Sequence, residues 1–137
     1  MRKIDKIIIH CSATPQDREV SVSTIRKWHL QRRFSDIGYH YVIHLDGTIE
    51  TGRPLNKQGA HTARANRGSI GICYVGGMDK NMKKSKDTRT QAQKDSLIKL
   101  MHELIYKYNK DMTIHGHNEF SNKKCPSFNV QEEYANL

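Results

Sequence analysis

The chain has 137 residues, of which 36% are apolar and 27% are charged. This length and apolar content predict a single domain spanning residues 1–137, and no apolar run approaches the roughly 20 residues of a membrane-spanning helix. The 23 lysines and arginines exceed the 14 acidic residues, giving a net charge of +9 that favours an anionic partner such as nucleic acid, a membrane surface or a cell-wall polymer. Three widely spaced cysteines argue against a disulfide framework.

The N-terminal third predicts one strand and one helix. Residues 6–10 form a β-branched run ending in His10, which is typical of a buried strand. Ser21 is a suitable N-cap for a helix that continues to about Arg32. The apolar spacing of this helix directs three side chains toward the core, those of Val22, Ile25 and Trp28.

The middle of the chain predicts strands separated by turns. Residues 39–45 and 48–51 flank Asp46-Gly47, which is a strong hairpin signal. Residues 52–68 show little periodicity and predict a long loop, and residues 69–75 are apolar enough for another buried strand.

The last third predicts a lysine-rich loop, a long helix, a short strand and a short helix. Thr90 and Gln93 have capping-box spacing ahead of an apolar stripe that continues to about Tyr108. Residues 112–117 predict the final strand, and Asn129 can cap the last helix. Because strands alternate with helices and one hairpin is present, we expect an α/β fold with a central mixed sheet flanked by helices.

The side chains at the predicted strand ends indicate metal chemistry. His10 ends the first strand, His117 ends the last, and Cys125 follows eight residues later. Two imidazoles and a thiolate suit Zn²⁺ and leave a fourth position for water. The alternative is that the histidines are ordinary hydrogen-bonded groups and the cysteine a small buried apolar residue. His115 is a rival ligand because it shares a strand face with His117.

Six short segments occur in a characteristic order along the chain. They are Ile9-His10-Cys11-Ser12-Ala13-Thr14, Gly38-Tyr39-His40-Tyr41, Asp46-Gly47-Thr48, Ser69-Ile70-Gly71-Ile72, Gly116-His117-Asn118-Glu119 and Lys123-Lys124-Cys125-Pro126-Ser127-Phe128. Together they resemble the zinc-dependent N-acetylmuramoyl-L-alanine amidases of the phage lysozyme type, which are relatives of the peptidoglycan recognition proteins. The resemblance covers residues 6–134, nearly the whole chain.

This resemblance implies a mixed sheet with zinc in a cleft on one face, and hydrolysis of the amide between N-acetylmuramic acid and L-alanine. It implies His10, His117 and Cys125 as the zinc ligands, with Tyr39 and Lys123 as catalytic residues. Zinc would activate water and polarise the carbonyl, while a lysine and a tyrosine can stabilise the developing oxyanion. We also expect the charges of Lys123 and its neighbouring lysine to lower the pKa of the Cys125 thiol.

Four loop residues are candidates for substrate binding. His61 occupies a position that lines the cleft in relatives, with an exposed loop histidine as the alternative. Arg64, Asn66 and Arg67 lie nearby, and arginine suits recognition of a stem-peptide carboxylate. Some phage relatives have a second histidine where this chain has Asn118, which affects a neighbouring contact rather than the metal site.

Three functions remain open from the sequence: a lytic amidase of the endolysin type, a non-catalytic peptidoglycan-binding module of the same fold, and a basic nucleic-acid or protein regulator. The presence of Cys125 favours the enzyme, because binding-only relatives typically lack that ligand. We therefore expect peptidoglycan as the partner, without nucleic acid or membrane, and a monomer. No secretory signal is recognisable, so we expect synthesis in the cytoplasm and action on the cell wall after lysis.

Overall fold

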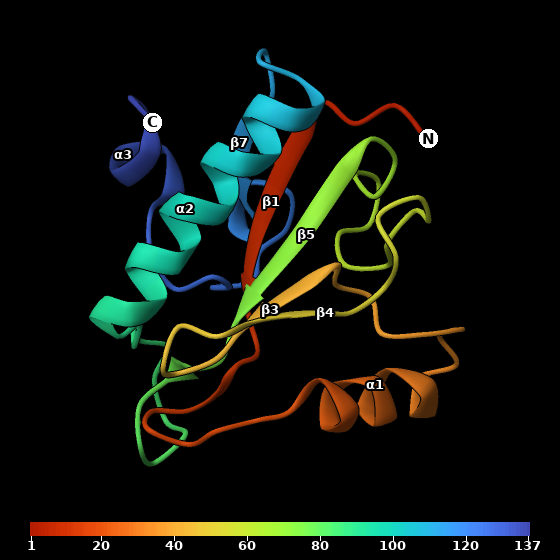
Figure 1. Cartoon of the computed structure of the whole chain (residues 1–137). Helices are drawn as coiled ribbons and strands as arrows, with labels where there is room; N and C mark the ends of the chain where they lie inside the picture. Colours follow the sequence, from red (N-terminus) through yellow and green to blue (C-terminus); the bar gives the residue numbers. More distant parts are fainter.

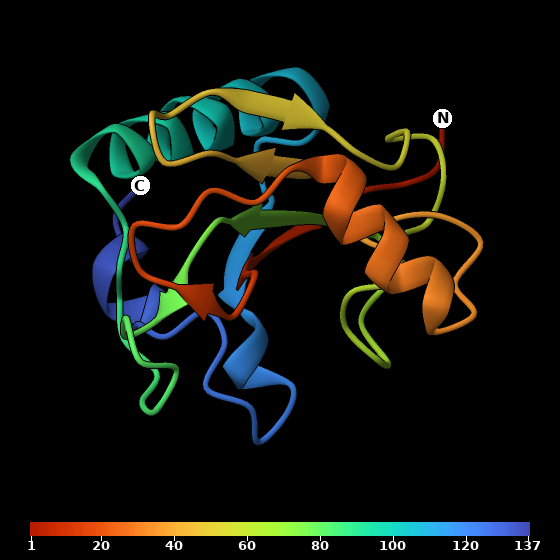
Figure 2. The same ribbon diagram turned by 90° about the horizontal axis from the view of Figure 1, so that it is seen from below.

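The computed structural model describes residues 1–137, arranged as a five-stranded mixed sheet with helices on both faces (Figures 1 and 2). This confirms the predicted α/β fold. The strands of the sheet are β1 (Lys6–Cys11), β3 (Tyr41–Ile43), β4 (Ile49–Thr51), β5 (Ser69–Tyr74) and β7 (Thr113–Gly116). The other elements are β2 (Thr14–Pro15), α1 (Val22–Gln31), β6 (Gly77–Met78), α2 (Gln91–Tyr108), the 3-10 helix η1 (His117–Glu119) and α3 (Val130–Tyr134).

The order of strands places the end of β1 beside the end of β7. The sheet order is β4-β3-β5-β1-β7, and all neighbours are parallel except the predicted β3–β4 hairpin. Ile9 lies opposite both Ile72 of β5 and Gly116 of β7. Because parallel strands end at the same edge of a sheet, His10 and His117 emerge next to each other.

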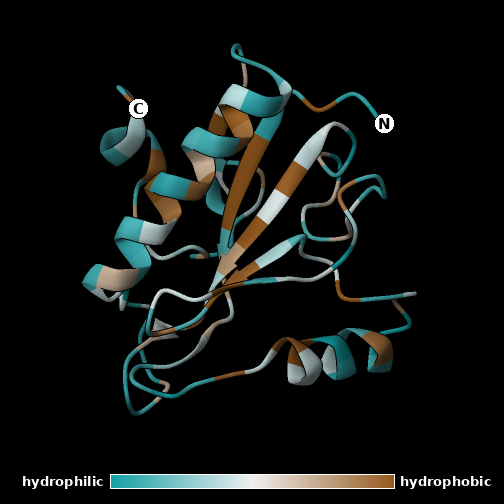
Figure 3. Ribbon diagram, in the orientation of Figure 1, coloured by the Kyte–Doolittle hydropathy of each residue, from teal (hydrophilic) through white to brown (hydrophobic).

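The alternation of side chains along β1 divides the core into two layers. Ile7 and Ile9 are fully buried and pack with α2 residues such as Leu97, while the next side chain along the strand, His10, faces the opposite side. The layer on the α1 side is smaller and includes Ile25 and neighbouring residues of β3 and β5. Figure 3 shows the apolar character of β1 and β5 between these layers.

The three predicted helix caps are present. The Ser21 hydroxyl accepts a hydrogen bond from the Thr24 N–H at 3.0 Å, and the Asn129 amide oxygen accepts one from the Glu132 N–H at 3.0 Å. Thr90 and Gln93 form the reciprocal capping box at the start of α2. Each cap satisfies a helical N–H that has no partner within the helix.

The prediction for Trp28 was wrong, because its side chain is 40% exposed. The buried side chains of α1 are those of Val22, Ile25 and His29. Trp28 precedes His29 by one residue, so its side chain is rotated by about 100° around the helix axis from that of His29. His29 occupies the inner position because its Nδ1 accepts a hydrogen bond from the Gly38 N–H at 2.8 Å.

Two strand boundaries also differ from the expectation. The first strand of the hairpin covers only Tyr41–Ile43, and the last strand ends at Gly116. His117 therefore begins η1 instead of ending a strand. No helix in the structure has both the length and the apolar character required to cross a membrane.

Two adjacent residues of α2 allow a matched test of the core. Leu97→Ala should lower the free energy of unfolding by about 2–5 kcal/mol, because Leu97 is fully buried against the sheet. Ile98→Ala should change it by less than about 1 kcal/mol, since Ile98 is 38% exposed. Urea unfolding followed by circular dichroism measures both, and equal losses would contradict this assignment of the core.

Candidate metal centre and substrate cleft

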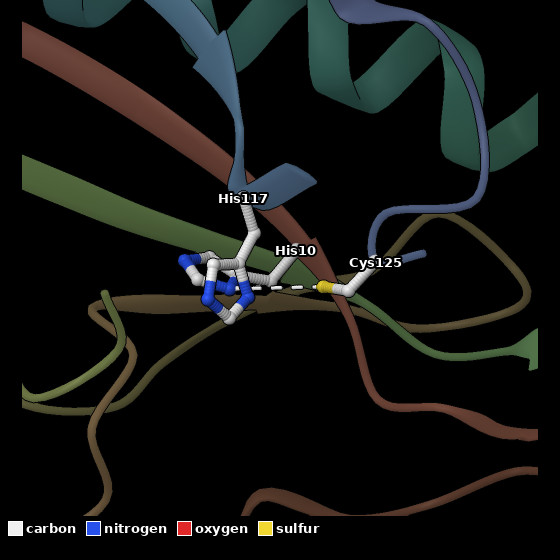
Figure 4. A group of neighbouring side chains, drawn as sticks. All are labelled: His10, His117 and Cys125. Atoms are coloured by element: carbon white, nitrogen blue, oxygen red, sulfur yellow. Dashed lines mark hydrogen bonds between the residues drawn. The ribbon is translucent and has the colours of Figure 1, made fainter. Parts of the chain in front are cut away.

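Three potential metal ligands converge from different parts of the chain. His10 lies in β1, His117 begins η1 directly after β7, and Cys125 lies in the loop before α3. One donor atom from each residue lies within 4.8 Å of the other two, and the three side chains point toward one another in Figure 4. The cluster could therefore hold a metal ion.

The orientation of the His10 ring is determined by hydrogen bonds on its far side. Its Nε2 lies 2.8 Å from His61 Nδ1 and 3.2 Å from the Thr62 hydroxyl. Its Nδ1 faces the cluster, 3.8 Å from the Cys125 sulfur. Metal-binding histidines typically use one ring nitrogen for the metal and the other for such an outer partner. This contact of His61 with His10 was not predicted from the sequence.

The loop that carries Cys125 is joined to the sheet at several points. The backbone N–H of Cys11 donates a hydrogen bond to the Cys125 sulfur at 3.2 Å. The Tyr74 hydroxyl donates to the Pro126 carbonyl at 2.6 Å, and the Ser127 hydroxyl donates to the Gly77 carbonyl at 3.0 Å. These contacts hold the sulfur beside the end of β1.

His115, the rival ligand, does not join the cluster. Its Nδ1 lies 2.9 Å from a carboxylate oxygen of Glu119, and its Nε2 lies 2.8 Å from the Thr113 hydroxyl. Glu119 also accepts a hydrogen bond from the Gly116 N–H at 2.7 Å. This contact stabilises the turn that separates His115 from His117 and directs the latter toward His10.

Burial keeps both imidazoles of the cluster neutral. It is the main cause of the lowered pKa of His10 and His117, and the charge of Lys123 lowers both further. A neutral imidazole has the free lone pair that a metal requires. The imidazole nitrogens of His10 and His117 are therefore available to bind a metal ion at neutral pH.

The expectation for the Cys125 thiol was wrong. Its pKa is raised, first by the adjacent Cys11 thiol and then by burial. The charges of Lys123 and Lys124 are not among the main causes that set this pKa. A metal ion would have to displace the thiol proton when it binds.

The cluster borders a cleft of about 440 Å³. Tyr39 and Lys123 both line this cleft, as does His117. The Tyr39 and His10 rings are 5.1 Å apart between centroids. Burial raises the pKa of the Tyr39 phenol well above its usual range, so it stays protonated at neutral pH. The two predicted catalytic side chains are therefore next to the predicted ligands.

The four predicted substrate-binding residues divide into two pairs. His61 and Asn66 line the cleft, whereas Arg64 and Arg67 are exposed and lie outside its lining. The Asn66 side-chain oxygen accepts hydrogen bonds from the His61 and Thr62 N–H groups at 2.9 and 2.8 Å, which shapes the loop. The arginines could contact only a part of a substrate that extends beyond the cleft.

Arg89 has a structural role that was not predicted from the sequence, and its side chain is completely buried. It forms ion pairs with Asp87 at 2.8 Å and Glu133 at 2.7 Å. Its guanidinium lies over the Phe128 ring, 3.5 Å from the centroid. Arg89 thus joins the start of α2 to α3 and to the segment that follows Cys125. Its position before a capping box, in a lysine-rich stretch, provides no signal of this role.

The family model for N-acetylmuramoyl-L-alanine amidases matches residues 1–128. The chain is a member of this amidase family. It is 41% identical over 127 residues to the endolysin of Escherichia phage T7, covering 93% of this chain and 83% of that protein. The endolysin of Enterobacteria phage K11 is 37% identical over 130 residues, covering 95% and 85%.

Solved structures show the same relationship. An endolysin amidase from Clostridium intestinale superposes with a TM-score of 0.81 at 29% identity, covering 98% of this chain and 85% of that one. The Drosophila peptidoglycan recognition protein LB, solved as a point mutant in complex with tracheal cytotoxin, gives 0.80 at 25% identity, covering 100% and 83%.

The protein is thus an N-acetylmuramoyl-L-alanine amidase of the endolysin type, which hydrolyses the amide between N-acetylmuramic acid and L-alanine in peptidoglycan. Amidases of this family are typically metal-dependent, in agreement with the cluster formed by His10, His117 and Cys125. The recognition-protein relatives give only weak support to the alternative of a binding module without activity.

His40, which follows Tyr39, holds the sheet in place beneath the cleft of the amidase. The Gly71 N–H donates to its Nδ1 at 3.0 Å, so its Nε2 carries the proton and lies 2.9 Å from the Lys57 carbonyl. The ring is 1% exposed, and burial lowers its pKa to about 4. The contact with Gly71 requires the neutral ring, because a protonated Nδ1 could not accept that hydrogen bond.

This predicts a pH-dependent stability. The unfolded chain binds a proton at His40 below about pH 6.5 but the folded chain does not, so the free energy of unfolding falls as pH decreases from 6.5 toward 4. Between pH 7 and pH 5 this group contributes a loss of about 1–2 kcal/mol. Urea unfolding of the chelator-treated protein should show a smaller loss in His40→Gln, and an unchanged loss would refute the assignment.

Proposed function

We propose that His10, His117 and Cys125 are the ligands of a zinc ion and that Tyr39 and Lys123 are the catalytic residues. Two nitrogen donors and one sulfur donor suit Zn²⁺, and three protein ligands are typical of catalytic zinc sites. Support comes from the convergence of these three side chains at the edge of a cleft. When bound, zinc would supply a Lewis acid and an activated water.

The surroundings of the cluster fit such an ion. The Cys11 N–H donates to the Cys125 sulfur, which favours the thiolate over the thiol. His61 occupies the outer nitrogen of His10, leaving the inner nitrogen available. Such outer contacts orient the side chains that would bind the metal.

Tyr39 and Lys123 are suited to stabilise the charge that develops on the scissile carbonyl. The Tyr39 phenol remains protonated at neutral pH and can donate a hydrogen bond. Lys123 lines the same cleft as Tyr39, so its positive charge is available to a substrate carbonyl bound there. Hydrogen-bond donors already oriented toward an oxyanion lower the barrier because they need no rearrangement during the reaction.

Substrate binding follows from the lining of the cleft. We propose that His61 contacts the muramyl peptide while orienting His10, and that Asn66 maintains the shape of the loop. Arg64 and Arg67 would bind a carboxylate of the stem peptide beyond the cleft. In this proposal the protein acts as a monomer on the cell wall after lysis.

Cys125→Ala should abolish both zinc binding and amide cleavage, because it removes one of three ligands. Atomic absorption of the purified variant and the release of L-alanine amino groups from isolated cell walls measure the two effects. Cys73→Ala is the matched control for metal content, since Cys73 is a fully buried thiol outside the cluster. One zinc per chain and full turnover in Cys125→Ala would refute the ligand assignment.

Tyr39→Phe and Lys123→Met should keep their zinc and each lower kcat by about 10²–10³-fold, the usual effect of losing an oxyanion donor. Tyr106→Phe and Lys99→Met are matched controls on the exposed surface of α2 and should retain activity. Steady-state assays with a soluble muramyl tripeptide, with zinc measured on the same samples, test this prediction. A loss of zinc in Tyr39→Phe would instead make Tyr39 a structural residue.

A further inference from the structure

A second hollow lies on the other side of the loop that carries Cys125. It measures about 880 Å³ and separates the lysine-rich loop after β6 from the segment between β7 and α3. The two loops are next to each other at the lower edge of Figure 2, coloured green and blue. The lining residues are Lys83, Lys84, Ser85, Asn118, Glu119, Lys124, Ser127, Phe128 and Asn129.

This hollow shares a wall with the cleft of about 440 Å³ that borders the cluster of His10, His117 and Cys125, here called the metal cleft. His117 and Lys123 line the metal cleft, and their immediate neighbours in the chain, Asn118 and Lys124, line the second hollow. Successive side chains of one loop therefore point into two separate spaces. A ligand long enough to cross this loop could occupy both at once.

The charge of the second hollow is positive and uncompensated. Lys83, Lys84 and Lys124 are exposed and form none of the ion pairs of the protein. Glu119 is the only acidic residue in the lining. Its carboxylate oxygens already accept hydrogen bonds from the Gly116 N–H and from Gln131, and one lies 2.9 Å from His115.

The same hollow has a rigid aromatic side chain in its lining. The Arg89 guanidinium lies over the Phe128 ring, and the Tyr74 and Tyr134 rings lie beside it at centroid distances of 6.4 and 6.0 Å. Phe128 is half-buried and still borders the hollow. An aromatic ring, amide side chains and cations together suit a ligand with apolar, amide and carboxylate groups.

We propose that this hollow is a second substrate subsite, which binds a carboxylate-bearing stem peptide of a neighbouring peptidoglycan repeat while the scissile repeat occupies the metal cleft. The proposal rests on peptidoglycan being the substrate of the amidase. That polymer repeats the same glycopeptide, so further stem peptides lie near each scissile bond. The subsite would increase the rate on polymeric wall and leave the rate on a single muramyl peptide unchanged.

The experiment compares two triple variants with equal loss of charge. The subsite variant replaces lysines of the hollow, and the control replaces exposed lysines of α2 and the turn after it. The subsite variant is Lys83→Gln, Lys84→Gln and Lys124→Gln, and the control is Lys99→Gln, Lys107→Gln and Lys110→Gln. Amino-group release is measured on isolated insoluble walls and on soluble N-acetylmuramoyl tripeptide, each at low and high salt.

The subsite variant should lose about tenfold in kcat/KM on walls at low salt, a size consistent with losing three exposed charge contacts. It should keep wild-type kcat/KM on the tripeptide, and added salt should reduce the difference on walls. The control variant should match the wild type on both substrates. Equal losses in both variants on walls, no loss in either, or an equal loss on the tripeptide would each overturn the proposal.

A failure of the amidase assignment would be distinguishable. In that case the wild-type protein itself would release no amino groups from the tripeptide, whatever the variants do.

Discussion

The metal-binding cluster of the amidase depends on how the loop before α3 is held against the end of β1. Cys11 directly follows His10, and its backbone N–H donates a hydrogen bond to the sulfur of Cys125, which lies 114 residues further along the chain. This contact places one predicted ligand beside another. Hydrogen bonds from Tyr74 and Ser127 hold the rest of the loop, so the sulfur has few alternative positions.

Two sets of buried polar side chains lie around the metal-binding cluster: neutral histidines and one ion-paired arginine. Around the cleft, His29, His40 and His61 act as neutral hydrogen-bonding groups, since burial lowers the pKa of each ring. On the other side of the sheet, Arg89 is charged and buried, and two carboxylates compensate it. Neutral rings and a fully paired cation are the two ways in which polar groups are buried at low cost.

The distribution of charge relates the net positive charge to the substrate. Lys123 faces the metal cleft, while Lys124 and the lysines after β6 face the neighbouring hollow. Cations on both sides of one loop suit a polymer that carries carboxylates at regular intervals. Part of the positive charge, which by composition alone was compatible with nucleic acid, membrane or cell wall, thus lies next to the candidate site of amide hydrolysis.

Local patterns in the sequence determined the secondary structure and the residue types of the site. The β-branched run before His10, the Asp46-Gly47 turn and the Thr90 capping box depend on neighbouring residues, and they are present as predicted. The family resemblance added the selection of His117 over His115. Patterns of spacing alone could not make that choice, because both residues belong to the same predicted strand and share one of its faces.

Only the tertiary structure decided the contacts between distant segments. The partnership of His10 with His61, the burial of Arg89 and the exposure of Trp28 depend on which surfaces meet after folding. The pKa of Cys125 is raised because Cys11 lies against it and water is excluded, whereas the lysines next to it in the sequence are not among the main causes. Adjacency in the chain is a poor guide to electrostatics, since burial and distance in space control the strength of each interaction.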